Sequence, residues 1–405
     1  MLYRLATRLA QPLAALALRA GLAQPALAQR LAQVQQPALD RPVWLHAASV
    51  GELASATRII AALRQHHPLL ITTNSTTGTA LARDLAAHPA PFAMAVQLAP
   101  LDFPQALETF LAHHRPRLYI AVESEIWPNR SAALAARGVA QAMIGGRLSA
   151  RSARRWGRMR GLVGPVLARL AAFSAQDADS EARLLALGAP ASARLPQVQL
   201  KLLDPARTPL PADSPARDMT VLAASTHDGE DAAILDAFLS VHARHPQARL
   251  ILAPRHPRRG DAIAALIAAR GQSVRRRSSG DSGAGATVLL ADTLGEMADW
   301  YRAAGICIVA GSFGRSGGHT PWEPAAHCCA ILHGPDVANH ADGYALLDAA
   351  GGARAVNTGT LAPALDTLLA DAAQARAMGH AARAVLDDHA GDARPLLTQL
   401  LALAG

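Results

Sequence analysis

Short apolar runs alternate with longer Ala-rich segments along most of the chain. The first group of runs covers residues 43–48, 69–73, 94–98, 118–122, 141–144 and 171–174. Nearly continuous apolar runs bounded by turn residues are typical of parallel strands that are buried on both faces. The segments between them, such as Leu53–His66 and Phe103–Arg115, have the composition of helices. The pattern therefore predicts an α/β fold built from βαβ units.

The pattern is interrupted once and then starts again. Residues 203–219 are rich in Pro, Asp and Arg, have no apolar period, and are predicted to be a linker. A second group of runs covers residues 220–224, 249–253, 287–290, 306–310 and 330–332. We therefore expect two Rossmann-like, doubly wound domains, residues 36–202 and 220–405, that face a central cleft at the carboxyl ends of the strands. The last helix of the chain is a candidate to pack back on the first domain.

The first 35 residues differ from both domains. Arg4, Arg8 and Arg19 occur among Leu and Ala at helical spacing, and no apolar stretch is long enough to span a bilayer. This pattern is typical of a basic amphipathic helix that lies in a headgroup layer. The alternative, equally open on the pattern alone, is an amphipathic helix packed on its own domain. Residues 1–35 are therefore a candidate membrane-associating segment.

Composition narrows the classes of partner. Among the 405 residues, 39 Lys and Arg outnumber 31 Asp and Glu, and the net charge of +8 favours an acidic partner such as nucleic acid, a nucleotide or an anionic lipid. Aromatic residues make up only 4%, which argues against binding of single-stranded nucleic acid by base stacking. The three cysteines are odd in number and form no CxxC pair, so a disulfide framework is excluded and a structural zinc site is disfavoured.

Carboxylates follow two strands of the first domain. Ser49, Gly51 and Glu52 come directly after the first strand, where a general base could meet a substrate hydroxyl. The same spacing fits a capping box, in which Ser49 and Glu52 only begin a helix, and spacing alone favours that alternative. Glu123 and Glu125 follow another strand, where they either orient a polar acceptor or belong to a solvated, helix-capping loop.

Basic and glycine-rich segments follow strands of the second domain. Arg255 and His256 lie in a Pro-stiffened turn and can donate hydrogen bonds to a phosphate, although basic turns are common in a basic protein. Residues 311–324 are rich in glycine and lead into a helix start, where backbone amides attract an anion. Glu323, one turn into that helix, could accept both hydroxyls of a ribose. A generic glycine-rich connection is the alternative, but a nucleotide site is the favoured interpretation.

Arginines are concentrated between residues 147 and 169. Exposed arginines on a helix are usually a solvated face, but so many in one span could bind anionic headgroups if the chain meets a membrane. They are Arg147, Arg151, Arg154, Arg155, Arg158, Arg160 and Arg169.

Ten short motifs occur in an order that resembles one family of enzymes. They are WLHAASVGE (44–52), TTNSTTG (72–78), PLDFP (100–104), ESEIWPN (123–129), RLS (147–149), STHDGE (225–230), PRHP (254–257), DTLGEM (292–297), GGH (317–319) and EPAA (323–326). In this order they resemble the 3-deoxy-D-manno-octulosonic acid (Kdo) transferases of lipopolysaccharide assembly, and the resemblance spans nearly the whole chain.

This resemblance implies a fold, a reaction and a location. The fold is GT-B, with an acceptor domain followed by a CMP-binding domain. The reaction moves Kdo from CMP-Kdo to a lipid A precursor, lipid IVA, with inversion and without a required metal or cofactor. The location is the cytoplasmic face of the inner membrane, held peripherally or by the N-terminal segment. The implied partners are CMP-Kdo, the lipid A precursor and an anionic membrane surface, and not nucleic acid.

The resemblance also implies roles for single residues. Glu52 would be the general base, and Glu123 and Glu125 would shape the acceptor side. Arg255 would hold the CMP phosphate with help from backbone amides, and Glu323 would bind the ribose. The full set implied in binding CMP-Kdo is Ser225, Thr226, Arg255, His256, Met297, Gly317, Gly318 and Glu323. The set expected to face the acceptor or the headgroups is Ser49, Gly51, Arg147, Arg151, Arg154 and Arg155.

Several positions depart from the family pattern. Thr320 stands where the family usually has Asn, Trp322 where it has Leu, and Gly145 where it has Asn, and residues 198–201 read VQLK in place of a GNLK-like segment. Because these positions lie mostly around the donor pocket and the domain junction, two alternatives stay open. One is a divergent GT-B protein that uses another nucleotide sugar, or a nucleotide-sugar epimerase. The other is a non-catalytic module that binds a nucleotide or a lipid.

Overall fold

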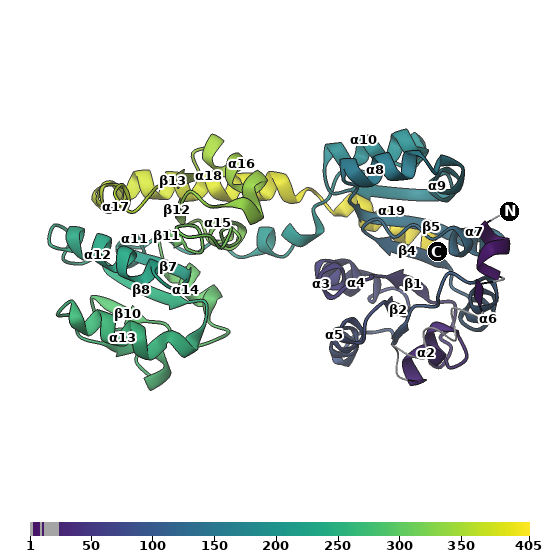
Figure 1. Ribbon diagram of the computed structural model, residues 1–405, viewed down its shortest axis with the longest axis horizontal. Coiled ribbons are helices and arrows are strands. Elements are labelled where there is room, and N and C mark those ends of the chain that lie inside the picture. The colour runs from purple at the N-terminus through teal and green to yellow at the C-terminus, as the bar shows by residue number, and fades with distance from the viewer. Residues whose placement is uncertain (1–2, 9, 12–23) are drawn as a thin grey trace. The chain divides into compact units, whose positions relative to one another are not determined.

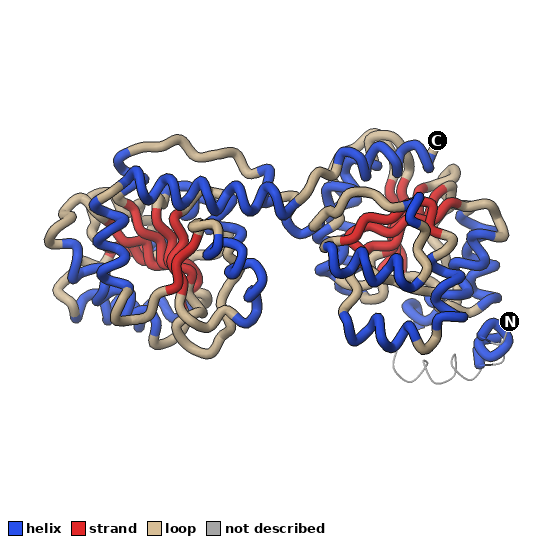
Figure 2. Tube along the Cα trace, turned by 90° about the horizontal axis from the view of Figure 1, so that it is seen from above, coloured by secondary structure: helices blue, strands red, loops and turns tan. Residues whose placement is uncertain are grey.

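The computed structural model describes residues 3–8, 10–11 and 24–405. The chain divides into two compact units, one formed by Met1–Leu203 together with Ala390–Gly405 and the other by Asp204–His389. Each unit contains one parallel sheet with helices on both of its faces, which can be followed in Figures 1 and 2. The predicted α/β class, with two Rossmann-like doubly wound domains, is confirmed.

The sheet of the first unit has six parallel strands in the order β3-β2-β1-β4-β5-β6. The strands are β1 (Val43–His46), β2 (Leu69–Thr73), β3 (Met94–Leu98), β4 (Leu118–Val122), β5 (Ala140–Gly146) and β6 (Leu170–Ala175). Every residue of β1, β2 and β4 is buried, because helices cover both faces of the sheet. The central strand β1 pairs in continuous register with β2 and β4, so its last residue, His46, lies at the carboxyl edge of the sheet.

Ten named helices belong to the described part of the first unit. They are α2 (Gln24–Arg30), α3 (Val50–Ser55), α4 (Thr57–Leu63), α5 (Thr76–Ala87), α6 (Pro104–His114), α7 (Pro128–Ala135), α8 (Ala150–Gly157), α9 (Arg160–Leu167), α10 (Ala178–Leu187) and α19 (Arg394–Ala404). Side-chain caps begin several of them, because Ser49, Ser75, Ser149 and Asp177 each accept a hydrogen bond from a backbone N–H in the first turn.

The last helix of the chain, α19, lies in the first unit. Its residues Leu396, Leu400 and Ala404 are buried in the hydrophobic core that also contains Val43 of β1. Arg117 donates a hydrogen bond to the carbonyl oxygen of Ala404 at 2.9 Å. The first unit is therefore completed by a segment that is distant from it in sequence.

The sheet of the second unit has seven parallel strands in the order β13-β12-β11-β7-β8-β10-β9. The strands are β7 (Thr220–Thr226), β8 (Arg249–Pro254), β9 (Arg275–Arg276), β10 (Val288–Leu290), β11 (Ile306–Val309), β12 (Ala330–His333) and β13 (Ala353–Ala355). The two edge strands, β9 and β13, have no apolar run, which is why the hydrophobic pattern does not predict them. The five inner strands agree with the predicted runs.

The helices of the second unit cover its sheet from both sides. They are α11 (Pro215–Asp218), α12 (Glu230–His242), α13 (Gly260–Ala269), α14 (Met297–Ala303), α15 (Trp322–Ala326), α16 (Ala341–Ala349), α17 (Leu361–Ala370) and α18 (Ala372–Ala390). The segment predicted as a linker is attached to this unit, because Arg217 donates to the carbonyl oxygen of Cys328 at 3.0 Å and Asp218 accepts from Arg376 Nε at 3.0 Å. The second unit accordingly begins at Asp204 rather than at residue 220.

Only part of the candidate membrane-associating segment is described. Residues 3–8 are helical, Tyr3 Oη donates to Asp102 Oδ2 at 3.1 Å, and Asn129 Nδ2 donates to Thr7 Oγ1 at 2.8 Å. These contacts attach the helix to the first unit. Residues 1–2, 9 and 12–23 lie outside the described residues, so the expectation of membrane contact for residues 1–35 falls largely on them. Among the helices that are described, none combines the length and apolar character needed to cross a bilayer.

Candidate functional site

The strand order of the first sheet makes the gap between β1 and β4 the candidate position for a ligand. The chain leaves β1 toward one edge of the sheet and β4 toward the other, and ligands of doubly wound folds bind where the order reverses. Glu52 lies in α3, which follows β1, and Glu123 and Glu125 lie in the loop that follows β4. The three predicted carboxylates therefore come together at this switch point.

Glu52 is both a helix cap and a perturbed carboxylate. Its Oε2 accepts from the backbone N–H of Ala48 at 2.5 Å, one residue before the N-cap, and its own N–H donates to Ser49 Oγ at 3.2 Å, so the two residues form a variant of the predicted capping box. Burial raises the pKa of Glu52, the hydrogen bond from Ala48 opposes that shift, and the charges of Glu125 and Glu123 raise the pKa further. A raised pKa makes this half-buried carboxylate a stronger proton acceptor than an ordinary glutamate.

Glu123 and Glu125 are held in different ways. Glu123 has a left-handed backbone, with φ of 56°, and its carboxylate lies 3.4 Å from Lys201 Nζ. Glu125 Oε2 accepts from Trp127 Nε1 at 2.6 Å and lies 3.2 Å from His46 Nε2. Burial alone would raise the pKa of Glu125, but the hydrogen bonds from His46 and Trp127 and the charge of Arg130 outweigh it, so that this pKa is lowered.

Two buried residues beneath this loop were missed by sequence reasoning. His46 is fully buried at the end of β1, and Arg130 is 2% exposed in the first turn of α7. The Arg130 guanidinium lies 5.2 Å from the ring centroid of Trp44 and 5.4 Å from that of Trp127. Their location relative to the motifs could have identified them, because His46 belongs to the WLHAASVGE motif and Arg130 directly follows ESEIWPN.

Asp102 fixes the start of α7. It accepts from the backbone N–H groups of Asn129 at 3.1 Å and Arg130 at 2.8 Å, and Asn129 Nδ2 donates back to the carbonyl oxygen of Asp102 at 2.7 Å. A carboxylate at a helix N-terminus satisfies donors that the helix leaves unpaired. The PLDFP motif thereby sets the position of the ESEIWPN loop.

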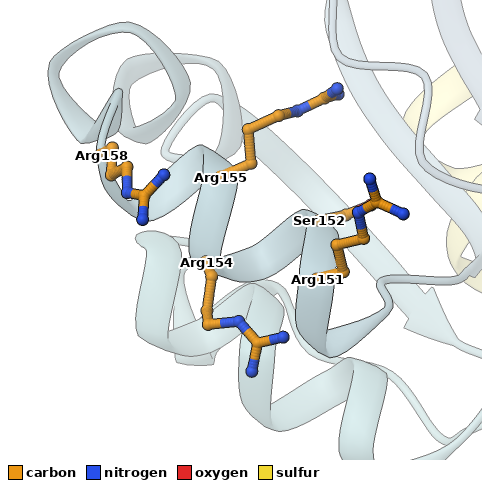
Figure 3. A pocket seen from close by; sticks show the side chains of 5 residues that line it. All are labelled: Arg151, Ser152, Arg154, Arg155 and Arg158. Atoms are coloured by element: carbon orange, nitrogen blue, oxygen red, sulfur yellow. The ribbon is translucent and has the colours of Figure 1, made fainter.

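The arginines of α8 form an unpaired basic face, which Figure 3 shows around a cavity of about 350 Å³. Arg151, Arg154, Arg155 and Arg158 line it and are exposed. Among the described residues, none of these four has a carboxylate within ion-pair distance. Arg147 is also exposed, at the turn before α8. The cavity therefore presents several unneutralised guanidinium groups, the donors that bind phosphate well.

The other predicted acceptor residues are exposed: Ser49 is the N-cap of α3, and Gly51 lies in its first turn. They begin the helix that carries Glu52, and only Ser49 has a defined hydrogen bond there, as the cap. Both lie near the switch point, and their role toward an acceptor stays a prediction.

The switch point of the second sheet lies between β7 and β11. Glu230, at the start of α12, joins the loops that follow these two strands. It is 4% exposed and accepts from the N–H groups of His227 and Gly311, both at 2.8 Å, and of Phe313 at 3.0 Å. Sequence reasoning placed Glu230 in the STHDGE motif without assigning it a role. Because it satisfies three backbone donors from two loops, it shapes the loop surface at this switch point.

Arg255 is an unpaired cation at this edge of the sheet. It follows β8 and is exposed, as is His256 beside it, and among the described residues its guanidinium has no carboxylate partner. Its neighbour Arg259 differs, because it donates to Asp231 and to the carbonyl oxygen of Thr226. Arg255 therefore stays the predicted phosphate-binding residue, and its guanidinium is available to a ligand.

Three donor-side predictions rely on polar groups that already have hydrogen-bond partners within the second unit. Thr226 is fully buried and its hydroxyl donates to Asp231 at 2.6 Å. The N–H of Gly317 donates to Asp336 Oδ2 at 2.8 Å, and the N–H of Gly318 donates to the carbonyl oxygen of Gly311 at 2.9 Å. The two glycines instead allow a turn, since both have φ above 70°.

The remaining donor-side predictions lie at the same edge of the sheet. Ser225 is partly exposed, with φ of 60°, at the end of β7. Met297 begins α14 and is partly exposed. Glu323 is exposed in the first turn of α15, where Tyr301 Oη donates to its Oε2 at 3.1 Å. Glu323 thus keeps one carboxylate oxygen available to a ligand hydroxyl.

A histidine pair at this switch point was also missed. His227 Nε2 and His319 Nε2 lie 2.9 Å apart, and the two rings stack with centroids 5.1 Å apart. One nitrogen must carry a hydrogen while the other accepts it, so the pair cannot be doubly charged in this geometry. Burial lowers the pKa of His319, and the charges of His227 and Arg255 lower it further. A side chain at Gly311 would come within 2.9 Å of the His319 ring, which is why the loop requires glycine there.

Comparisons with known proteins agree on one family. A family profile described as 3-Deoxy-D-manno-octulosonic-acid transferase (kdotransferase) matches residues 25–202. The chain is 38% identical to a 3-deoxy-D-manno-octulosonic acid transferase of Bordetella pertussis, over 89% of this chain and 87% of that protein. It is 31% identical to the enzyme of the same name from Haemophilus influenzae, over 88% of this chain and 86% of that protein.

A solved structure shows a similar fold at low sequence identity. UDP-GlcNAc 2-epimerase from Neisseria meningitidis, bound to UDP-GlcNAc, aligns with a TM-score of 0.54 and 13% identity, over 89% of this chain and 99% of that chain. At this identity the likeness supports the two-domain α/β fold expected for GT-B proteins and carries no statement about substrate.

Proposed function

Because the chain belongs to the 3-deoxy-D-manno-octulosonic acid transferase family, we propose that it transfers Kdo from CMP-Kdo to a lipid A precursor in lipopolysaccharide core biosynthesis. The observation that carries the proposed chemistry is the group of three carboxylates at the switch point of the first sheet, with Glu52 the one whose pKa is raised. Transfer to a hydroxyl needs such a proton acceptor.

The proposed reaction is a single displacement. The acceptor hydroxyl oxygen attacks the anomeric carbon of Kdo, the bond from that carbon to the CMP phosphate oxygen breaks, and the configuration inverts. Glu52 accepts the hydroxyl proton, and the bond electrons leave with CMP. Its Oε1 is the oxygen assigned to this step, since Oε2 is held by the N–H of Ala48. Glu123 and Glu125 orient the acceptor from the neighbouring loop.

The second unit is proposed to bind CMP, the leaving group of the reaction. CMP gains negative charge as it departs, and a fixed cation near its phosphate stabilises that charge. Arg255 is assigned this task because it is exposed at the carboxyl edge of the sheet and has no carboxylate partner among the described residues. Glu323 is assigned the ribose, with Ser225, His256 and Met297 around the nucleotide. Thr226, Gly317 and Gly318 are assigned a supporting role only, since their polar groups already have partners.

The direct test is incubation of the full-length protein with CMP-Kdo and lipid IVA, with products read by mass spectrometry. We expect Kdo-bearing lipid IVA together with free CMP. A panel of UDP-sugars is the matched control, and it should give no product. Product from a UDP-sugar but not from CMP-Kdo would favour the divergent GT-B alternative, and no product with any donor would contradict the transferase assignment.

We also propose that the protein works at the cytoplasmic face of the inner membrane, where the α8 face meets phosphate groups. The support is the set of exposed arginines around the α8 cavity, which have no described acidic partner. Clusters of Lys and Arg attract anionic headgroups, with a contribution of about 1 kcal/mol for each residue near the surface. The helix formed by residues 3–8 would add a basic, partly apolar surface.

The double variant Arg154→Gln/Arg155→Gln is expected to weaken binding to vesicles of anionic phospholipid by about 10-fold or more, because two favourable headgroup contacts are lost. Co-sedimentation at low and high salt measures the effect, and the difference should shrink at high salt. The matched control, Arg83→Gln/Arg115→Gln, removes the same charge from exposed positions elsewhere in the first unit and should bind nearly as wild type. Equal loss in both double variants would show that net charge, and not this face, attracts the membrane.

A further inference from the structure

A chain of buried hydrogen bonds leads from the core of the first unit to Glu125. Trp44 Nε1 donates to Thr72 Oγ1 at 2.8 Å, and Thr72 Oγ1 lies 2.9 Å from His46 Nδ1. His46 Nε2 lies 3.2 Å from Glu125 Oε2. Trp44, Thr72 and His46 all have an exposed fraction of 0%, so water does not compete for these bonds.

The neighbours of His46 Nδ1 are compatible with either tautomer, because Nδ1 lies 2.9 Å from the hydroxyl of Thr72 and 3.1 Å from the carbonyl oxygen of Thr72, which can only accept. The indole N–H of Trp44 only donates, so the Thr72 hydroxyl accepts from it and can donate to His46 Nδ1. A neutral imidazole carries one N–H, and the carboxylate of Glu125, whose pKa is lowered, selects the tautomer with that hydrogen on Nε2, so that Nδ1 accepts from the Thr72 hydroxyl. Burial lowers the pKa of His46 to about 4, and the charge of Arg130 acts in the same direction, so the imidazole is neutral near pH 7.

Only one oxygen of Glu125 is used by these contacts. His46 Nε2 and Trp127 Nε1 both meet Oε2. In the part of the chain that the structure describes, Oε1 has no hydrogen-bond or ion-pair partner. The side chain is 19% exposed, so the carboxylate is held at one oxygen while the residue still reaches solvent.

We propose that His46 is a positioning residue for the transfer reaction, which fixes Glu125 through one carboxylate oxygen and leaves the other free to accept a hydrogen bond from a hydroxyl of the acceptor sugar. This inference rests on the proposed function, because it assigns the free oxygen to the acceptor. It goes beyond that function because it assigns a role at the acceptor site to His46, a fully buried histidine that touches neither substrate.

The same contact acts on Glu52 through charge. His46 keeps Glu125 ionised, and the Glu125 charge is one of the causes, after burial, that raise the pKa of Glu52. The charged and titratable groups that bear on these carboxylates are Arg30, His46, Glu52, Tyr119, Glu123, Glu125, Arg130 and Lys201. Of these, His46 is the fully buried group that donates a hydrogen bond directly to Glu125.

The sign of the pH effect follows from this coupling. The base must be deprotonated, so kcat/KM rises with pH through the pKa of Glu52. Without the His46 donor, burial raises the pKa of Glu125, and Glu125 is neutral more often at the acidic end of the profile. Glu52 then meets less repulsion, and the acidic limb of the kcat/KM profile moves to lower pH.

Two variants of one position separate positioning from packing. A glutamine places its amide nitrogen close to where Nε2 of a histidine lies, whereas an asparagine places it close to Nδ1. We expect His46→Asn to lower kcat/KM for lipid IVA by about 10- to 100-fold, mainly through KM, as for loss of a hydrogen bond to a charged group. His46→Gln should stay within about threefold of wild type. The acidic limb should move to lower pH in His46→Asn, as in Glu125→Gln, and remain in place in His46→Gln.

Thr72→Val tests the hydrogen bond between Thr72 and His46, on the side of His46 that faces away from Glu125, while preserving the branched shape of the side chain. It removes the hydroxyl that orients His46, so we expect a smaller loss in kcat/KM and a shift of the acidic limb in the same direction. Because thermal melting of each variant reports folding, Thr72→Val and His46→Gln decide the question if His46→Asn does not fold. The proposal would be overturned if every variant kept the wild-type kcat/KM and the wild-type pH profile. It would also be overturned if His46→Asn and His46→Gln lost kcat/KM equally while the acidic limb of the profile stayed in place.

A second measurement does not depend on enzyme activity. In protein labelled with ¹³C at the glutamate carboxyl carbons, the Glu125 signal is assigned by its loss in Glu125→Gln. Its titration should move to higher pH in His46→Asn and not in His46→Gln. If wild type transfers no Kdo while this shift is seen, the proposed function fails and the hold of His46 on Glu125 stands. If wild type transfers Kdo but the titration does not move, the proposed function stands and the role of His46 fails.

Discussion

Glu52→Gln is expected to slow Kdo transfer by about 10²- to 10⁴-fold, the usual contribution of a general base, while binding of CMP stays as in wild type. Glutamine cannot take the proton, but it can still accept from the N–H of Ala48, because glutamine also serves in capping boxes. The substitution therefore separates the two functions that the structure combines in one carboxylate. Single-turnover transfer to lipid IVA measures the first, and calorimetric titration with CMP measures nucleotide binding.

Two controls accompany Glu52→Gln. Glu52→Ala removes both the base and the cap, so it should match Glu52→Gln in rate but unfold at lower temperature. Ser75→Ala removes an equivalent cap at the start of α5, which follows β2 and carries none of the three carboxylates, and should lose about 1 kcal/mol of stability with little change in rate. Transfer by Glu52→Gln at the wild-type rate would remove Glu52 as the base.

Arg255→Ala is expected to weaken CMP-Kdo binding by about 10- to 100-fold, the range for loss of a hydrogen bond to a charged group. The reason is that Arg255 is exposed beside the switch point of the second sheet and has no described acidic partner, so its charge is available to a phosphate. The rate of the chemical step should fall as well, because the charge on departing CMP exceeds the charge in the ground state. KM for CMP-Kdo and the single-turnover rate measure the two effects.

The matched control is Arg258→Ala, three residues further along. Arg258 is exposed in the turn formed by Pro257–Arg259 and also lacks a carboxylate partner among the described residues. Its loss removes the same net charge and should change KM for CMP-Kdo by less than about threefold. Arg255→Lys should restore part of the affinity, since lysine keeps the charge without the bidentate geometry. Equal effects at residues 255 and 258 would reduce the role of Arg255 to general electrostatics.

The site could be predicted in part because its residues follow strands. Parallel strands end at one edge of a sheet, so Glu52 and Glu125 could be expected to meet although they are 73 residues apart in number. His46 could not be assigned in the same way. A histidine at the end of an apolar run has no pattern of its own, and its partner Thr72 comes from another strand.

The sequence by itself determined the two parallel sheets, most strand positions and the family, because apolar runs and ordered motifs are local properties of the chain. Only the tertiary structure decided which polar groups are free. The amides of Gly317 and Gly318 and the hydroxyl of Thr226 are satisfied internally, whereas Arg255 has no carboxylate partner among the described residues. The physical reason is that each buried donor must find an acceptor, and partners such as Asp336 for Gly317 are brought near only by folding.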